Sequence, residues 1–141
     1  MSTVDDHEQG HEAERYRSSV LREVSNTMVR LHKEQFGRGP TKARSDWAGN
    51  DVLVCLLEDT LTPAERKLIE MGEHQRLRDA RLFFQYSSVR EFCEPVERLT
   101  GRTVRAFMSA IDTEANGLVT ELFVLYPEGH EGPSRIERAE P

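Results

Sequence analysis

The chain has 141 residues, of which 37% are hydrophobic and 31% charged, and its formal net charge is −6. This length suits one domain with its own hydrophobic core. The acidity lies at the ends, because residues 1–14 hold five Asp or Glu and no Lys or Arg, and residues 128–141 hold four Glu and two Arg. Residues 15–127 carry a charge of only +1. A near-neutral body argues against a nucleic-acid partner, since such proteins present a basic face.

The cysteine count and the apolar runs predict a cytoplasmic protein. Cys55 and Cys93 are too few for a disulfide framework and indicate a reducing compartment. The acidic N-terminus has no apolar run, so we expect no signal peptide. No segment approaches the roughly 20 apolar residues of a membrane span, so we expect no direct membrane insertion.

The first predicted element is a long helix. Residues 1–13 are polar without periodicity, and we expect a disordered acidic tail there. Over about 13–36 the apolar residues recur mostly at spacings of three, four and seven, which predicts one amphipathic helix. At about 1.5 Å per residue it would be about 35 Å long, which exceeds the body of a small domain. We therefore expect part of its apolar stripe to face a second copy in a homodimer.

The turn after Phe36 ends this helix and begins the first strand. Gly37 can adopt the left-handed conformation that closes a helix. Pro40 cannot continue a helix, and it favours an extended Gly39. Arg38 lies between two glycines, so its side chain is presented on a tight turn.

A β-hairpin follows. Residues 41–48 alternate weakly, as an edge strand does, and residues 52–57 are rich in β-branched residues and leucine, as a central strand is. Gly-Asn-Asp at 49–51 supplies the turn between them.

Two helices come next. Thr62 can cap the first of them, Pro63 suits its first position, and Glu65 can reach back to the backbone of the cap. Gly72 ends this short helix. A longer helix is expected over about 73–99, with a kink or break near Glu91 because Pro95 removes one backbone hydrogen bond, and with Gly101 as its end.

The last predicted elements are the strands 103–111 and 118–126, joined by a turn that ends in Asn-Gly. Residues 128–141 are rich in Glu, Gly and Pro and predict a flexible tail. The order α-ββ-αα-ββ predicts an α+β domain over 14–127, with one four-stranded antiparallel sheet and helices packed on one face.

Seven segments in this order resemble one protein family. They are HKEQFGRGPTKAR at 32–44, VCLLED at 54–59, LTPAE at 61–65, RDAR at 78–81, VERLTGRTV at 96–104, AFMS at 106–109 and ELFVL at 121–125. Together they resemble the bacterial MpsC-like family. The resemblance implies the third, soluble component of a sodium-translocating, membrane-potential-generating system linked to uptake of inorganic carbon, and it carries no catalytic residues over to this chain.

This chain also departs from the family pattern. Many members have a histidine followed by Asp-Pro-Asp after the position of Ser109, whereas residues 112–117 here contain neither His nor Pro. Any function of that histidine is therefore lost. The aromatic run at 83–86 and Pro95 are also unusual, which is typical of a divergent copy with a partner of its own.

Three arginines are the candidate ligand-binding residues. Arg78 and Arg81 are three apart and share a helix face, and Arg38 is presented by its turn. Our hypothesis is that they converge on one pocket and clamp a carboxylate, bicarbonate or phosphate. The structural alternatives, a helix end at the Gly37–Pro40 turn and ordinary ion pairing along the helix, carry more weight.

Nothing in the sequence predicts catalysis, a metal or a cofactor. Glu34, Glu58 and Asp59 lack an assigned proton acceptor. Cys55 lies in an apolar strand and is expected to be a buried structural residue. No His, Cys or Asp spacing matches a zinc site, and the glycine turn lacks the context of a phosphate-binding loop.

The favoured function is a non-catalytic accessory or regulatory module that docks on a membrane cation or inorganic-carbon transport system, peripheral to the membrane. Phe83, Tyr86 and Phe92 would supply exposed contact surface. The alternative is a small-molecule or anion-binding regulatory domain with the arginines as its pocket, and an enzyme is ranked last.

Overall fold

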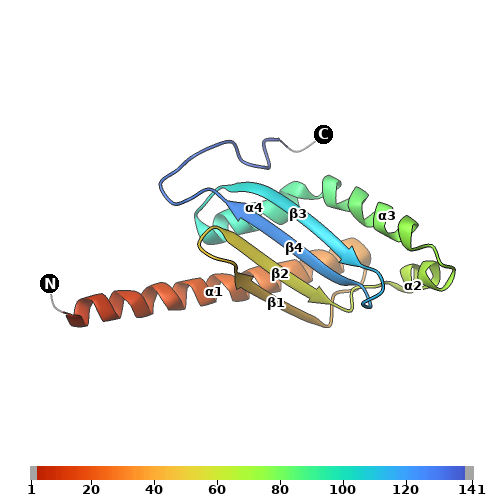
Figure 1. Cartoon of the computed structure of the whole chain (residues 1–141), viewed down its shortest axis with the longest axis horizontal. Helices are drawn as coiled ribbons and strands as arrows, with labels where there is room; N and C mark the ends of the chain where they lie inside the picture. The colour runs from red at the N-terminus through yellow and green to blue at the C-terminus, as the bar shows by residue number, and fades with distance from the viewer. Residues whose placement is uncertain (1–2, 139–141) are drawn as a thin grey trace.

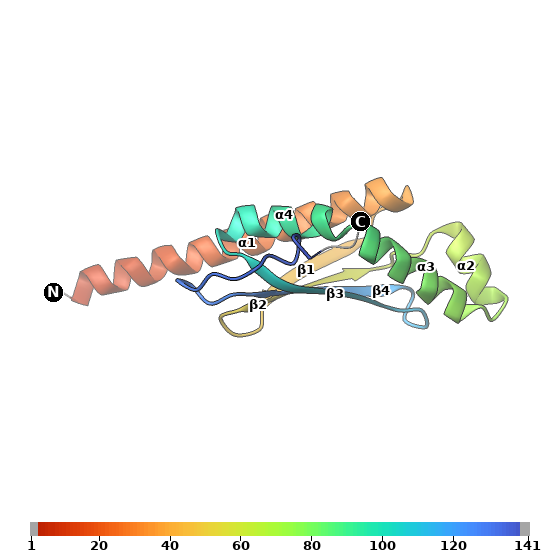
Figure 2. The same ribbon diagram turned by 90° about the horizontal axis from the view of Figure 1, so that it is seen from above.

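The computed structural model describes residues 3–138, with side chains from residue 8 onward. Its elements are α1 (Thr3–Phe36), β1 (Lys42–Trp47), β2 (Val52–Glu58), α2 (Pro63–Glu70), α3 (His74–Ser87), α4 (Val89–Thr100), β3 (Val104–Asp112) and β4 (Leu118–Leu125). The strands form one antiparallel sheet in the order β1-β2-β4-β3. In Figure 1 and Figure 2, α1 and α4 lie across one face of this sheet, and α2 and α3 lie near the end where β2 finishes. The predicted α+β class, element order and sheet are confirmed.

The core lies between the covered face of the sheet and the helices α1 and α4. Side chains alternate along β2 and β4, so every second residue points into the core. The buried hydrophobic residues come from α1 (Val20, Val24, Met28, Leu31), α4 (Val89, Phe92, Cys93, Val96), β2 (Leu53, Cys55, Leu57), β3 (Val104, Phe107) and β4 (Val119, Phe123, Leu125). Nearly all of the predicted helical stripe is therefore used within this chain.

Strand β3 departs from the expected strict alternation. Its register with β4 shifts between Val104 and Ala106, which is a β-bulge. The extra residue brings both Val104 and Phe107 to the buried face. The sequence pattern had placed them on opposite faces.

Helix α1 begins at Thr3, well before the expected start at Ala13. The prediction of disorder over 1–13 is therefore wrong for residues 3–13, and residues 1–2 lie outside the described part. No proline interrupts this segment, so its backbone can continue the helix. Residues 8–16 are all exposed, and Figure 1 shows this end of α1 projecting beyond the sheet.

The single helix expected over 73–99 is divided at Ser88, three residues before the predicted break at Glu91. The side-chain amide of Gln35 donates a hydrogen bond to the Ser88 hydroxyl at this point. Pro95 lies inside α4 on its buried side without dividing it. Gly101, with φ +68°, then ends α4.

Much of the C-terminal segment is packed on the body, contrary to the flexible tail predicted over 128–141. The Ser134 hydroxyl donates to Glu97 Oε2 at 2.8 Å, and the backbone N–H of Arg135 donates to the Val104 carbonyl at 2.8 Å. Ile136 packs against the core. Residues 139–141 lie outside the described part.

Candidate functional site

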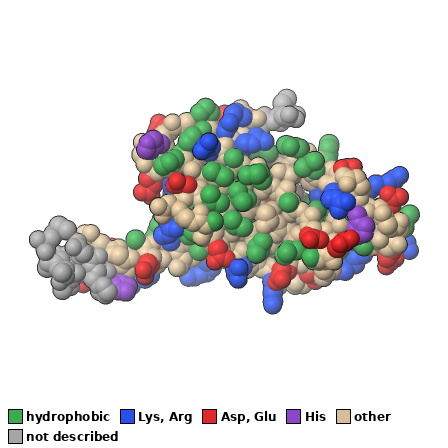
Figure 3. Space-filling view, in the orientation of Figure 1, with side chains coloured by type: hydrophobic (Ala, Val, Ile, Leu, Met, Phe, Trp, Pro, Cys, Tyr) green, Lys and Arg blue, Asp and Glu red, His purple; other side chains and the backbone are tan. Residues whose placement is uncertain are grey.

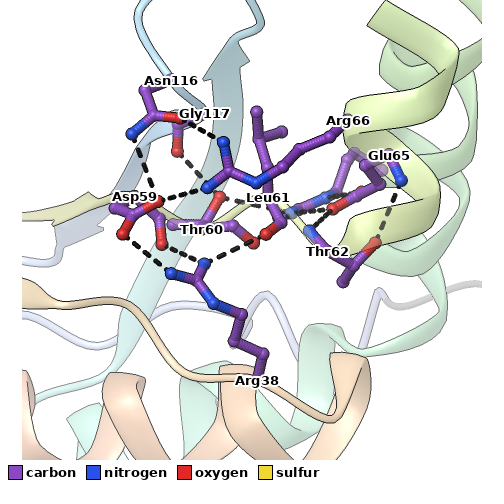
Figure 4. Close-up of polar contacts among 10 residues, drawn as sticks. Arg38, Asp59, Thr60, Leu61, Thr62, Glu65, Arg66, Asn116 and Gly117 are labelled. Carbon is purple, nitrogen blue, oxygen red and sulfur yellow. Dashed lines mark hydrogen bonds and ion pairs between the residues drawn. The ribbon is translucent and has the colours of Figure 1, made fainter.

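The turn after α1 is tied to the loop after β2 by Arg38. Gly37 has φ +75° and ends the helix. The Arg38 guanidinium donates from Nη1 to the carbonyls of Asp59 and Leu61, at 2.6 and 3.0 Å, and from Nη2 to Asp59 Oδ2 at 2.7 Å (Figure 4). Its charge is therefore already paired, and its donors stabilise the conformation of the loop.

Asp59 is the centre of this network. Its φ is +56°, a conformation uncommon for a residue other than glycine. Its Oδ1 accepts hydrogen bonds from Arg66 Nη2 at 2.8 Å and from Asn116 Nδ2 at 3.2 Å. Hydrogen bonding from Arg38, opposed in part by desolvation, together with the charges of Arg38 and Arg66, holds the pKa of Asp59 below its ordinary value. Asp59 is an ionised structural group rather than a proton donor.

The predicted cap of α2 forms and is extended by a buried ion pair. Thr62 Oγ1 accepts from the Glu65 N–H at 3.2 Å, Glu65 Oε1 accepts from the Thr62 N–H at 2.9 Å, and Pro63 is the first helical residue. Arg81 donates to both carboxylate oxygens of Glu65, at 2.6 and 2.7 Å. Burial alone would raise the pKa of Glu65, but hydrogen bonds from Arg81 and Thr62 and the Arg81 charge outweigh it, and the pKa is lowered.

Arg81 commits its Nε and Nη2 donors to partners within the chain. It also donates to the Thr60 carbonyl at 3.0 Å, and its guanidinium carbon lies 4.2 Å from the centre of the Phe36 ring. Arg78 is exposed and donates weakly to Thr113 and Gln75, at 3.3 to 3.4 Å. The structure thus brings Arg78 and Arg81 to one cavity but leaves Arg38 outside its lining. The predicted convergence of three arginines does not occur.

The other predicted residues have ordinary structural roles. Glu34 lies on the surface, with its Oε1 3.8 Å from Arg30 Nε, and Glu58 is exposed at the end of β2. Phe83 and Tyr86 are exposed at 68% and 50%, as expected. Phe92 is 3% exposed, so its assignment to a contact surface is wrong: the ring stacks on Phe107 inside the core.

A cavity of about 310 Å³, which no pattern in the sequence predicted, borders this network. Its lining comes from α1, α3, α4, β3 and β4. Phe36, Phe84 and Phe92 form aromatic walls, and Ile111 and Val119 add aliphatic surface.

Two buried polar residues, His32 and Glu121, lie among the cavity's lining. Each residue is 2% exposed, and His32 Nε2 lies 3.4 Å from Glu121 Oε1. His32 Nδ1 is 3.0 Å from the Met28 carbonyl. Glu121 Oε2 is buried and has no hydrogen-bond partner among the described residues. A signal for Glu121 existed in the sequence, because the alternation of β4 places it between Val119 and Phe123 on the buried face.

Among the side chains that the structure describes, those of residues 8–138, no group of three or more His, Cys, Asp and Glu is arranged to hold a metal ion. No helix in the described part of the chain has the length and apolar character needed to cross a membrane.

A family model described as "Na+-translocating membrane potential-generating system (MpsC)" matches residues 16–126. No curated protein and no solved structure matches the chain. The matched region holds the whole sheet, the Arg38–Asp59 network and both His32 and Glu121. Since the match covers most of the 141 residues, the chain belongs to the MpsC family.

Proposed function

We propose that this chain is a non-catalytic accessory subunit of a Na⁺-translocating, membrane-potential-generating system, and that it binds another protein of that system through the uncovered face of its sheet. The family description supports the link to the system. The free thiols of Cys55 and Cys93 fit a position on the cytoplasmic side, where thiols stay reduced.

The observation that carries the proposal is the open face, defined as the outward side chains of β2 (Val52, Val54, Leu56), β4 (Leu118, Leu122, Val124) and β3 (Met108). Met108, Leu122 and Val54 lie in register across three adjacent strands, so the apolar surface is continuous. No helix covers this face in Figure 2, and Figure 3 shows hydrophobic side chains gathered over it. Contiguous exposed apolar surface of this kind is typical of an interaction site.

The charges around the open face favour a protein partner over a lipid surface. Arg44 and Asp46 lie beside it on β1 and pair at 2.9 Å. Lys42 and Glu58 lie opposite each other in the same pair of strands. Binding to an anionic membrane would need an excess of basic residues, whereas a rim of both signs suits the polar border of a protein interface.

The motif residues of the Arg38–Asp59 network support the non-catalytic part of the proposal. Arg38, Arg81 and Glu65 are occupied by one another or by the loop backbone, so their role is to hold the turn after β2. Homodimer formation stays a prediction, and the helical stripe that suggested it is mostly buried within this chain.

The test is complementation of a host strain that lacks the gene, with Na⁺-dependent membrane potential measured by a voltage-sensitive dye. Val54→Asp places a charge in the centre of the open face and should fail to restore the potential. Met71→Asp is the control, since Met71 is 65% exposed at the end of α2, and it should restore the potential. Circular dichroism of both purified variants checks that they fold.

Two outcomes would contradict the proposal. Restoration of the potential by folded Val54→Asp would remove the open face from the function. A purified wild-type chain that sediments as a dimer, and a Val54→Asp variant that sediments as a monomer, would show that a second copy covers the face instead.

A further inference from the structure

We propose that the cavity beside α3 binds a small, mainly apolar or aromatic molecule that carries one neutral hydrogen-bond donor, a hydroxyl or a ring N–H, and that Glu121 accepts this hydrogen bond. This inference is independent of the open face and of the partner proposed for it.

The cavity has the size and character of a small-molecule site. Its volume of about 310 Å³ lies at the lower end of the range for such sites, roughly 300–1,000 Å³. Aromatic side chains with a few polar groups among them are the usual lining, and Phe36, Phe84 and Phe92 provide the aromatic part. Leu82 and Phe84 are 46% and 41% exposed, so the cavity opens along α3.

Glu121 has no structural reason to be a carboxylic acid. It occupies an inward position in the middle of β4, between the buried Val119 and Phe123. One of its oxygens faces His32, and the other, Oε2, has no partner among the described residues. A buried polar atom without a partner is costly, and an apolar residue would stabilise this position more. A ligand that donates to Glu121 would remove that cost.

The contacts of the pair decide which atom is left for a ligand. The Met28 carbonyl can only accept, so His32 Nδ1 carries a hydrogen. Nε2 faces Glu121 Oε1 at 3.4 Å. The other carboxyl oxygen, Oε2, has no partner among the described residues and is left as an acceptor.

A neutral donor fits this acceptor better than an anion. A carboxylate or phosphate would place acceptor oxygens against the Glu121 oxygen, which is itself an acceptor. Arg81, the most buried arginine of the lining, is already bound in bidentate fashion to Glu65. The aromatic walls and the single unpartnered acceptor fit a neutral molecule with an apolar body and one O–H or N–H.

The experiment compares three probes of similar size by ¹⁹F NMR titration of the full chain: 4-fluorophenol, 4-fluoroanisole and 4-fluorobenzoate. They differ in having a neutral donor, no donor and an anion. We expect 4-fluorophenol to bind at least about 5-fold more tightly than the other two, because only it satisfies the buried acceptor. Amide shift changes should cluster at residues 109–111 and 75–85. Equal affinities for the three probes, no binding of 4-fluorophenol, or shift changes elsewhere would overturn the proposal.

Two substitutions identify the acceptor. Glu121→Leu removes it and should make the affinities for 4-fluorophenol and 4-fluoroanisole equal. Glu121→Gln should keep the preference, because its NH₂ can donate to His32 Nε2 while its carbonyl oxygen receives the phenol. A preference that survives in Glu121→Leu would place the acceptor elsewhere, and the comparison of probes on the wild-type chain does not depend on either variant folding.

Discussion

Substitution of Arg81 by Met tests whether the network beneath the β2–α2 loop holds the fold together. The Arg81 side chain is 8% exposed and its partner Glu65 is 14% exposed. Methionine keeps an apolar stem but lacks the guanidinium that lies over Phe36, and it leaves a buried carboxylate and the Thr60 carbonyl without their donor. Removing one partner of a buried ion pair costs about 3–5 kcal/mol. We expect about 3 kcal/mol here, because Glu65 keeps the hydrogen bonds of its cap.

The assay is urea denaturation followed by far-UV circular dichroism, with Arg76→Met as the matched control. Arg76 pairs with Glu73 on the surface, where the two side chains are 75% and 41% exposed, so its loss should cost about 0–1 kcal/mol. The Arg81→Met variant should also melt about 10 °C lower than the wild type.

A double-mutant cycle with Glu65→Gln separates the pair from its surroundings. If Arg81 and Glu65 stabilise each other, the double variant should be about 2 kcal/mol more stable than the sum of the single losses predicts. Equal costs for Arg81→Met and Arg76→Met, or additive losses in the cycle, would refute this reasoning.

Three further predictions follow from the same structure. The thiols of Cys55 and Cys93 are fully buried, and burial is the main cause that raises their pKa values, to about 11 and about 12. Because the thiolate is the reactive form, alkylation by iodoacetamide at pH 8 should be at least about 100-fold slower in the folded chain than in urea. The pKa of Glu65 is lower in the folded chain than its unfolded value of about 4.3, so its ionised form stabilises the fold above that pH. This stabilisation is lost as the pH falls through the folded-state pKa. The difference in unfolding free energy between wild type and Glu65→Gln should therefore shrink on acidification from pH 6 to pH 3. Gly117 has φ +71°, and an added Cβ would lie 2.6 Å from a neighbouring side-chain carbon, so Gly117→Ala should destabilise the fold by about 2 kcal/mol. Gly10 lies within α1 with open space around it, so Gly10→Ala should stabilise the chain slightly in the same denaturation assay.

Local chemistry made several elements predictable from the sequence. The Thr62–Glu65 cap and the helix ends at Gly37 and Gly101 depend on residues within a few positions of one another. The two hairpins and their glycine turns could be predicted for the same reason, and the number of strands then indicated a single sheet.

Features that depend on contacts between distant segments were missed or displaced. The helix break lies at Ser88, which is hydrogen bonded to a residue of α1, and not at the proline-induced position near Glu91. The β3 bulge and the burial of Phe92 likewise follow from packing against neighbouring elements.

For this protein the sequence alone determined the α+β class, the order of its elements, the motif residues and its membership of the MpsC family, because these follow from local propensity, periodicity and motif order. Only the tertiary structure decided that Arg38 and Arg81 are bound by carboxylates from other segments, that one sheet face is uncovered, and that His32 and Glu121 lie together beside a cavity. The physical reason is distance along the chain. His32 and Glu121 lie on α1 and β4, so no local pattern can report a contact that exists only once the sheet and helices have packed together.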